Sequence, residues 1–289
     1  MRSACVLTDN SAQFPLPAFS GRGLVRILAH DISLRDIDHA GGKDLKLNQF
    51  PHSASSELNP RLIPPSVEKF REVMTNLSQD FDDILVILIS SHLSKAYENA
   101  LAAAKDTQGR STITVIDSQT ISVGLGILVQ TAASFLEEGR LAFDVEKRIR
   151  QMIPHIYTLL CTPGLTYLHH AGFIDHSQAT VGELLGLLPI FSLEEGKLSP
   201  LEKMRNYRAV LDFFQEFMDE FDELDYIALL QNGSLSNPDL RQLRQHSEES
   251  YPSTQYIEHM LNLPLATLFG PKCVGLFAIE SLASHGRLT

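Results

Sequence analysis

The chain has 289 residues, of which 44% are hydrophobic and 20% are charged, a composition typical of a globular protein. Its formal net charge of −11 argues against a nucleic-acid partner or an anionic-membrane surface, since both require a basic face. No apolar stretch reaches the ~18 residues that span a bilayer, and the N-terminal apolar run is too short for a secretory signal. We therefore expect a cytoplasmic protein without membrane insertion.

The sequence offers little for catalysis or metal binding. Cys5, Cys161 and Cys273 are scattered through apolar runs, which predicts small core residues rather than a disulfide set or a metal site. The adjacent pair His169 and His170 would diverge by about 100° on a helix, which makes it a poor chelate. Phosphate-loop, dinucleotide-binding and nucleophile-elbow motifs are missing from the sequence. We expect no metal, no cofactor and no catalytic residue.

Strands and helices alternate through the first half of the chain, which predicts a parallel sheet with right-handed crossovers. Apolar runs predict strands at 4–9, 23–34, 84–89, 113–117 and 155–162. Apolar residues at helical spacing predict helices at 66–77, 94–105, 121–138 and 141–152. Residues 35–65 contain Gly, Ser, Asn and Pro and predict a long ordered loop or a partly flexible lid.

Polar side chains follow several of these strands. The buried strand 84–89 runs into Ser90, Ser91 and Ser94 at the start of a helix. Backbone N–H groups at a helix start carry partial positive charge and bind anions, but serine is also a common helix cap, and both interpretations stay open. Asp9 and Asp117 also end strands. At the carboxyl ends of parallel strands they could bind a metal or act as acid and base. The alternative is that each caps a turn, and this alternative is favoured because Asp is common in turns and caps.

The second half predicts a different pattern. Short helices are expected within 165–187, and a hairpin within 187–200 that turns at Glu194–Gly196. The Ser199-Pro200-Leu201-Glu202 box predicts the start of a long helix that reaches Phe221. A strand (225–233), a helix from Asn237 and two final strands (263–271 and 273–280) follow. We place two domains at 1–163 and 164–289.

Seven stretches in order resemble the DegV family of bacterial fatty-acid-binding proteins. They are LTDNSA (7–12), PPSVEKF (64–70), ISSHLSKAYENA (89–100), VIDSQTISVGLGILV (115–129), LTYLHHAGFI (165–174), LLPIFSLEEGKLSPLEKMR (187–205) and FGPKCVGL (269–276). The resemblance implies a two-domain α/β fold, with a parallel N-terminal sheet that has helices on both faces and a C-terminal α/β domain with a hairpin and a long helix.

The same resemblance implies a carrier rather than an enzyme. A long-chain fatty acid would lie in an apolar tunnel in the C-terminal domain, with its carboxylate beside the first domain's strand ends. The family's head-group serine falls on Ser94, and the neighbouring Ser91 would assist it. Some members hand the fatty acid to a separate acyl kinase, which implies such a partner for this chain as well.

Several head-group positions depart from the family pattern. Leu62 and Ile63 replace the family's threonine and serine, Phe173 replaces its arginine, and Leu268 replaces its histidine. A buried carboxylate without partners costs several kcal/mol. Three hypotheses remain: a fatty-acid carrier that uses Ser94, a binder of an apolar ligand with a neutral head group that has lost handover to the kinase, and an interaction module whose pocket is filled.

Overall fold

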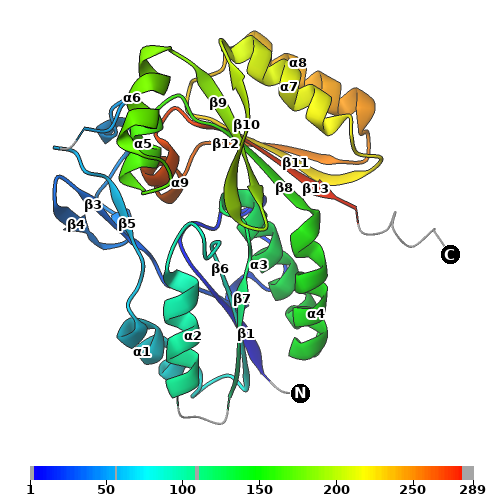
Figure 1. Cartoon of the computed structure of the whole chain (residues 1–289). Coiled ribbons are helices and arrows are strands. Elements are labelled where there is room, and N and C mark those ends of the chain that lie inside the picture. Colours follow the sequence, from blue (N-terminus) through cyan, green and yellow to red (C-terminus); the bar gives the residue numbers. More distant parts are fainter. Residues whose placement is uncertain (1–2, 56, 108–110, 282–289) are drawn as a thin grey trace.

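The computed structural model describes residues 3–55, 57–107 and 111–281 and contains two main sheets (Figure 1). The first is a parallel sheet in the order β2-β1-β6-β7. Its strands are β1 (Ala4–Thr8), β2 (Val25–Ile27), β6 (Asp83–Leu88) and β7 (Thr112–Asp117). The apolar side chains of β6 are all buried, as expected for a strand covered on both faces. The predicted parallel sheet is confirmed.

Helices cover both faces of this sheet (Figure 1). They are α1 (Val67–Leu77) and α2 (Ala96–Asp106) on one side, and α3 (Ser122–Glu137) and α4 (Ala142–Met152) on the other. Helix α3 contacts β1 and β6 of the first sheet as well as β8 (Ile156–Cys161) and β13 (Val274–Glu280) of the second. Its first half, Ser122 to Val129, is buried throughout, as this position between two sheets requires.

The second sheet has the order β10-β9-β8-β13-β11-β12 and is antiparallel except for the pair β11–β12. Strand β8 was expected in the first sheet, and this prediction is wrong, because β8 pairs with β13 and β9. An apolar run shows that a strand is buried but not which sheet buries it. The division at 163/164 stays a prediction, and β8 lies before it in the sequence while pairing with strands that lie after it.

The segment from 23 to 65 is more structured than expected. The single strand predicted at 23–34 is two strands in different sheets, β2 and β3 (Asp31–Leu34). Strand β3 forms a small antiparallel sheet with β4 (Ile37–His39) and β5 (Arg61–Ile63). Phe50 and Leu58 pack in one apolar cluster with Tyr167. This packing holds the segment in place, so it is a folded layer rather than a loop.

The hairpin of β9 (Leu188–Glu194) and β10 (Lys197–Met204) confirms the predicted turn. The helix expected from Ser199 is wrong, because those residues pair with β9. Pro200 is tolerated since β10 is an edge strand and its register shifts between Pro200 and Glu202. Helix α7 (Tyr207–Met218) begins later, where the Asn206 side chain accepts a hydrogen bond from the Ala209 N–H.

The remaining elements frame the second sheet. Helices α7 and α8 (Asn237–Ser250) pack against each other over it (Figure 1). Strand β11 (Leu224–Leu230), helix α8 and strand β13 confirm their predictions, whereas β12 (Gln255–His259) was missed. The strand predicted at 263–271 is helix α9 (Leu263–Phe269), capped by Asn262 with Pro264 in its first turn.

Short elements complete the fold. Helices α5 (Leu165–His170) and α6 (His176–Leu184) pack together, and α5 also packs on α9. Short 3-10 segments occur at Arg22–Leu24, Ala40–Gly42, Leu47–Gln49 and Ile153–His155. Within the described ranges, no helix combines the length and the apolar character needed to cross a membrane.

Candidate ligand-binding site

The carboxyl ends of the parallel strands carry two carboxylates that bind loop backbone. Asp9 Oδ1 accepts a hydrogen bond from the Ser11 N–H at 2.8 Å, and its Oδ2 accepts one from the Ile89 N–H at 2.9 Å. Asp117 Oδ1 accepts from the Gln119 and Ser91 N–H groups at 3.0 and 3.2 Å. Both residues therefore cap turns, the interpretation that their residue type favoured, and together they fix the loop that follows β6.

Ser94 lies in that loop, directly before α2, and faces a buried histidine. The Ser94 Oγ and His30 Nε2 atoms are 2.8 Å apart, and Oγ also accepts a long hydrogen bond of 3.3 Å from the Ala96 N–H. Helix α2 itself begins without a side-chain cap at Lys95. Ser94 thus binds the first helical N–H, but its main partner is His30, a residue that the sequence analysis did not select.

His30 is fully buried next to Asp9. Its Nδ1 atom lies 3.7 Å from Asp9 Oδ1, beyond hydrogen-bonding distance, and has no hydrogen-bond partner in the described part of the chain. Burial lowers the pKa of His30 below its usual 6.5, although the nearby charges of Asp9 and Asp31 oppose this. The imidazole is therefore mainly neutral near pH 7.

The turn between β2 and β3 brings His30 beside Asp9 and Ser94. The backbone N–H of His30 donates to Asn10 Oδ1 at 2.8 Å, and Asn10 Nδ2 donates back to the His30 carbonyl at 3.2 Å. This exchange holds His30 in the turn between β2 and β3. The sequence contains one indication of this turn. A strand over the 12 residues 23–34 would be longer than the usual 5–6 residues, which predicts an interruption within it.

The other serines of the loop have different partners. Ser90 is buried, and its Oγ donates to the carbonyl oxygen of Gly196 at the tip of the β9–β10 hairpin, at 2.7 Å. Ser91 is half-buried and tied through its backbone to Asp117. Of the three serines, Ser94 has its hydroxyl bound to an ionisable side chain.

An apolar pocket of about 800 Å³ lies between α6 and the β9–β10 hairpin. Its volume falls within the roughly 300–1,000 Å³ usual for small-molecule sites. Val181 of α6 and Leu185, directly after this helix, line the pocket and are 55% and 63% exposed, so its mouth is open. The walls also include Leu165, Phe173, Ile174, Leu187, Pro189, Phe191, Leu198 and Leu201.

The four positions at which the sequence departs from the family pattern lie partly in this pocket and partly in the core. Phe173 lines the pocket and stacks on Phe269 with ring centroids 6.1 Å apart. Leu62 and Leu268 pack in the same large apolar cluster as Phe173 and as Leu93, which precedes Ser94. Ile63 of β5 pairs with Asp31 of β3, the residue that follows His30 in sequence. Apolar packing thus extends from the serine loop to the pocket wall.

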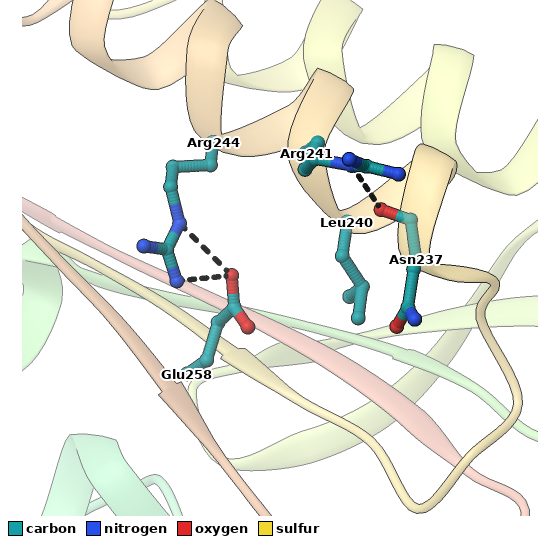
Figure 2. A pocket seen from close by; sticks show the side chains of 5 residues that line it. All are labelled: Asn237, Leu240, Arg241, Arg244 and Glu258. Carbon is teal, nitrogen blue, oxygen red and sulfur yellow. Dashed lines mark hydrogen bonds and ion pairs between the residues drawn. The ribbon is translucent and has the colours of Figure 1, made fainter.

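A second pocket, of about 400 Å³, lies between α8 and β12 and differs in chemistry (Figure 2). Arg244 donates to Glu258 Oε1 through Nη2 and Nε at 3.0 and 3.3 Å, and Arg241 Nε donates to the Asn237 carbonyl at 3.3 Å. Three of its five lining residues, Arg241, Arg244 and Glu258, are charged, and an alkyl chain bound there would displace their water at a cost. Its volume is also half that of the apolar pocket. The apolar pocket is the better ligand site.

The cysteines behave as predicted. Cys5, Cys161 and Cys273 are free thiols in the core. Burial raises the pKa of Cys5 and of Cys161 to about 12, which keeps both thiols protonated and unreactive at neutral pH. Among the described residues, no group of three or more His, Cys, Asp and Glu side chains is arranged to hold a metal ion.

Comparisons with known proteins match nearly the whole chain. A family model described as "Uncharacterised protein, DegV family" matches residues 3–281. A DegV domain-containing protein of Caldanaerobacter subterraneus subsp. tengcongensis is 24% identical over 284 residues, which cover 97% of this chain and 100% of the relative.

Solved structures agree with this fold. The structure of a DegV family protein from Thermus thermophilus, described by its fatty-acid binding, superposes with a TM-score of 0.81 at 24% identity. It covers 97% of this chain and 100% of its own. A DegV family protein from Eubacterium eligens loaded with heptadecanoic acid gives 0.79 at 16% identity, over 96% and 100%. At such identities these structures establish the fold.

Proposed function

The chain belongs to the DegV family, and from this premise we propose that it binds one long-chain fatty acid and acts as a carrier. The alkyl chain would lie in the apolar pocket between α6 and the β9–β10 hairpin, and the carboxylate would lie at Ser94. The observation that carries the proposal is the open apolar pocket of about 800 Å³, in a fold whose solved relatives include one loaded with heptadecanoic acid.

The energetics favour a long alkyl chain in this pocket. Each methylene removed from water contributes about 0.8 kcal/mol of binding free energy. A chain of fifteen or more carbons therefore contributes far more binding free energy than the head group. Val181, Leu185 and Leu201 expose apolar surface at the pocket, and a bound alkyl chain would cover it. Exposed apolar surface of this kind is typical of a site that binds an apolar ligand.

The head group would meet donors rather than a fixed positive charge. Ser94 offers one hydroxyl, and the start of α2 adds the partial positive charge of a helix N-terminus. The apolar side chains of Leu62, Phe173 and Leu268 supply neither a hydrogen-bond donor nor a positive charge. We therefore expect a carboxylate to be held less tightly here than at a site with an arginine or a histidine in direct contact.

A neutral head group is the second candidate, and one observation favours it. The buried His30 is mainly neutral, and the surroundings of Ser94 include apolar side chains in place of charged ones. An alcohol or ester would bury no charge there. Handover to an acyl kinase stays a prediction and goes with the fatty-acid hypothesis. The third hypothesis, a filled pocket, finds no support in a pocket of this volume.

Native mass spectrometry of protein purified from its own host tests the proposal. A mass increment equal to a long-chain fatty acid supports it, and an increment equal to a neutral lipid supports the second candidate. The same preparation, stripped of lipid, should gain thermal stability when oleate is added. Protein without any adduct, and without a thermal shift on addition of oleate or oleyl alcohol, would exclude both lipid candidates.

A further inference from the structure

The Ser94 hydroxyl has a single proton, and His30 decides where that proton points. The Ser94 Oγ atom lies 2.8 Å from His30 Nε2 and already accepts from the Ala96 N–H. If Nε2 carries a proton, it donates to Oγ, and the Ser94 proton is free for a ligand. If Nε2 lacks a proton, it accepts from Ser94, and the hydroxyl offers a ligand only a lone pair.

The other ring nitrogen faces Asp9, which makes the two neutral tautomers unequal. Nδ1 lies 3.7 Å from Asp9 Oδ1 and has no hydrogen-bond partner among the described residues. A proton on Nδ1 is attracted by this carboxylate, whereas a lone pair there is repelled. In the neutral form Asp9 therefore favours Nδ1–H, and this tautomer takes the Ser94 proton away from the ligand side.

A carboxylate ligand needs the opposite arrangement, because it accepts hydrogen bonds and donates none. The neutral tautomer with a proton on Nε2 frees the Ser94 proton but turns the Nδ1 lone pair toward Asp9 Oδ1. The doubly protonated imidazolium avoids this repulsion, because it places one proton toward Asp9 and a second proton toward Ser94 Oγ. Ser94 can then donate outward to the carboxylate. An alcohol head group, which can donate to Ser94, fits the neutral Nδ1–H tautomer without any change.

We propose that His30 is a positioning residue that sets the head-group preference of Ser94, and that a bound carboxylate takes up one proton onto His30 while a bound alcohol takes up none. This inference rests on the proposed function, since it assumes that the head group lies at Ser94. The proton enters from water, joins Nε2 of the neutral ring and leaves again when the fatty acid dissociates.

The charges around His30 support this coupling. Asp9 from the end of β1 and Asp31 from the start of β3 both act to raise the pKa of His30, against the larger effect of burial. The loop before α2 contributes the uncharged Ser94. A carboxylate at Ser94 would be a third negative charge, and it would raise the pKa of the ring further. The ring is thus neutral without the ligand and charged with it.

Calorimetric titration with oleate, delivered from a cyclodextrin complex, tests the inference. At pH 7.5, titrations in two buffers of different ionisation enthalpy should give an uptake close to one proton per oleate bound, and about zero for oleyl alcohol. The Kd for oleate should rise up to about tenfold per pH unit above neutrality, while the Kd for oleyl alcohol stays constant. This measurement needs no substitution, so it does not depend on how a variant folds.

Variants of His30 separate positioning from packing. In His30→Gln the side-chain amide reaches the Nε2 position and donates to Ser94 at every pH. Oleate should still bind, but without proton uptake and without the pH slope. In His30→Asn the shorter amide lies near the Nδ1 position and does not reach Ser94, so oleate affinity should fall. The control His39→Gln removes a histidine whose Nδ1 bonds the exposed Asp44 and not Ser94, and it should keep the wild-type pH slope.

The outcomes separate this inference from the function on which it rests. Oleate that binds wild-type protein with no proton uptake overturns the role of His30 and leaves fatty-acid binding intact. Proton uptake that persists in His30→Gln also overturns it, because another group must then titrate. Absence of binding for both oleate and oleyl alcohol overturns the proposed function and this inference together.

Discussion

The two ends of the proposed ligand site are built in opposite ways. At the polar end, the backbone around Ser94 is fixed by Asp9 and Asp117, and its hydroxyl meets one buried histidine. At the apolar end, the wall of the pocket exposes large side chains such as Val181 and Leu185. The polar end is closed and specific in geometry, whereas the apolar end is open and makes no directional bond.

This difference separates affinity from selectivity. Burial of an alkyl chain is roughly proportional to area and indifferent to the head group. The hydrogen bonds at Ser94 contribute less free energy, but they depend on whether the head group donates or accepts. We therefore expect changes in the pocket to alter the affinity for all long-chain ligands alike, and changes at the polar end to alter the order in which head groups are preferred.

The largest effect should come from a charge placed in the pocket wall. Leu198→Glu puts a carboxylate beside the alkyl chain, where loss of its hydration costs several kcal/mol. Binding of oleate and of oleyl alcohol should weaken alike by at least about a hundredfold, or ~2.7 kcal/mol, as measured by calorimetry. Ile37→Glu, at an exposed apolar residue of β4, is the control. Unchanged affinity in Leu198→Glu would place the chain elsewhere.

Ser94→Ala should have the next largest effect, and a selective one. Loss of a charge-assisted hydrogen bond costs about 1.5–3 kcal/mol for oleate, and about 0.5–1.5 kcal/mol for oleyl alcohol, whose bond is neutral. Displacement of a fluorescent fatty acid measures both. Ser177→Ala, at an exposed serine of the pocket rim, should change neither affinity by more than about 0.5 kcal/mol. Equal losses for the two ligands would contradict a head-group role.

Chain length should act through the apolar end alone. Shortening a saturated fatty acid by two methylenes should lower affinity by about 1.6 kcal/mol while the chain remains within the pocket. The same increment should appear in wild-type protein and in Ser94→Ala, since Ser94 does not line the pocket and substitutions that share no contacts have additive effects. Increments that differ between the two proteins would show that the ends are not independent.

The smallest effect should be the pH dependence of stability without ligand. Because burial lowers the pKa of His30, the unfolded chain binds a proton more readily than the folded one. The contribution of His30 to stability is therefore fully present above about pH 6.5 and is lost as the pH drops below that value. In thermal melts His30→Gln should show a shallower loss, though not a flat one, because burial also lowers the pKa of His170 and His259. An identical loss would mean that His30 does not titrate.

Much of the first sheet could be predicted from the sequence, because its strands carry apolar runs that need no partner to be recognised. Strand β8 has an equally apolar run, and the error lay in assigning it to a sheet. The partner of a strand is decided by contacts between residues distant in sequence, such as those of β8 with β13. Local periodicity does not predict these contacts. The family resemblance, by contrast, predicted the overall fold correctly.

Local signals misled where tertiary pairing overruled them. The Ser199-Pro200-Leu201-Glu202 box has the residues of a helix start, yet pairing with β9 keeps it extended. The apolar run of α9 is too short to distinguish strand from helix by periodicity. At the candidate site Ser94 could be selected in advance, but His30 could not, since the contact between them joins residues 64 positions apart.

The hydrogen bond from Ser90 to Gly196 has a consequence for ligand length. Gly196 has a φ of 80° and would carry a Cβ against the Ser90 side chain and 2.9 Å from Gln119 Cα, so the tip of the hairpin sits at a set position beside the serine loop. Leu198 of the pocket wall follows two residues later, at most about 7 Å along the chain. In the proposed site the distance from the head group to Leu198 is therefore set by the backbone, so ligands of any chain length would meet this part of the pocket wall at the same distance from their head group.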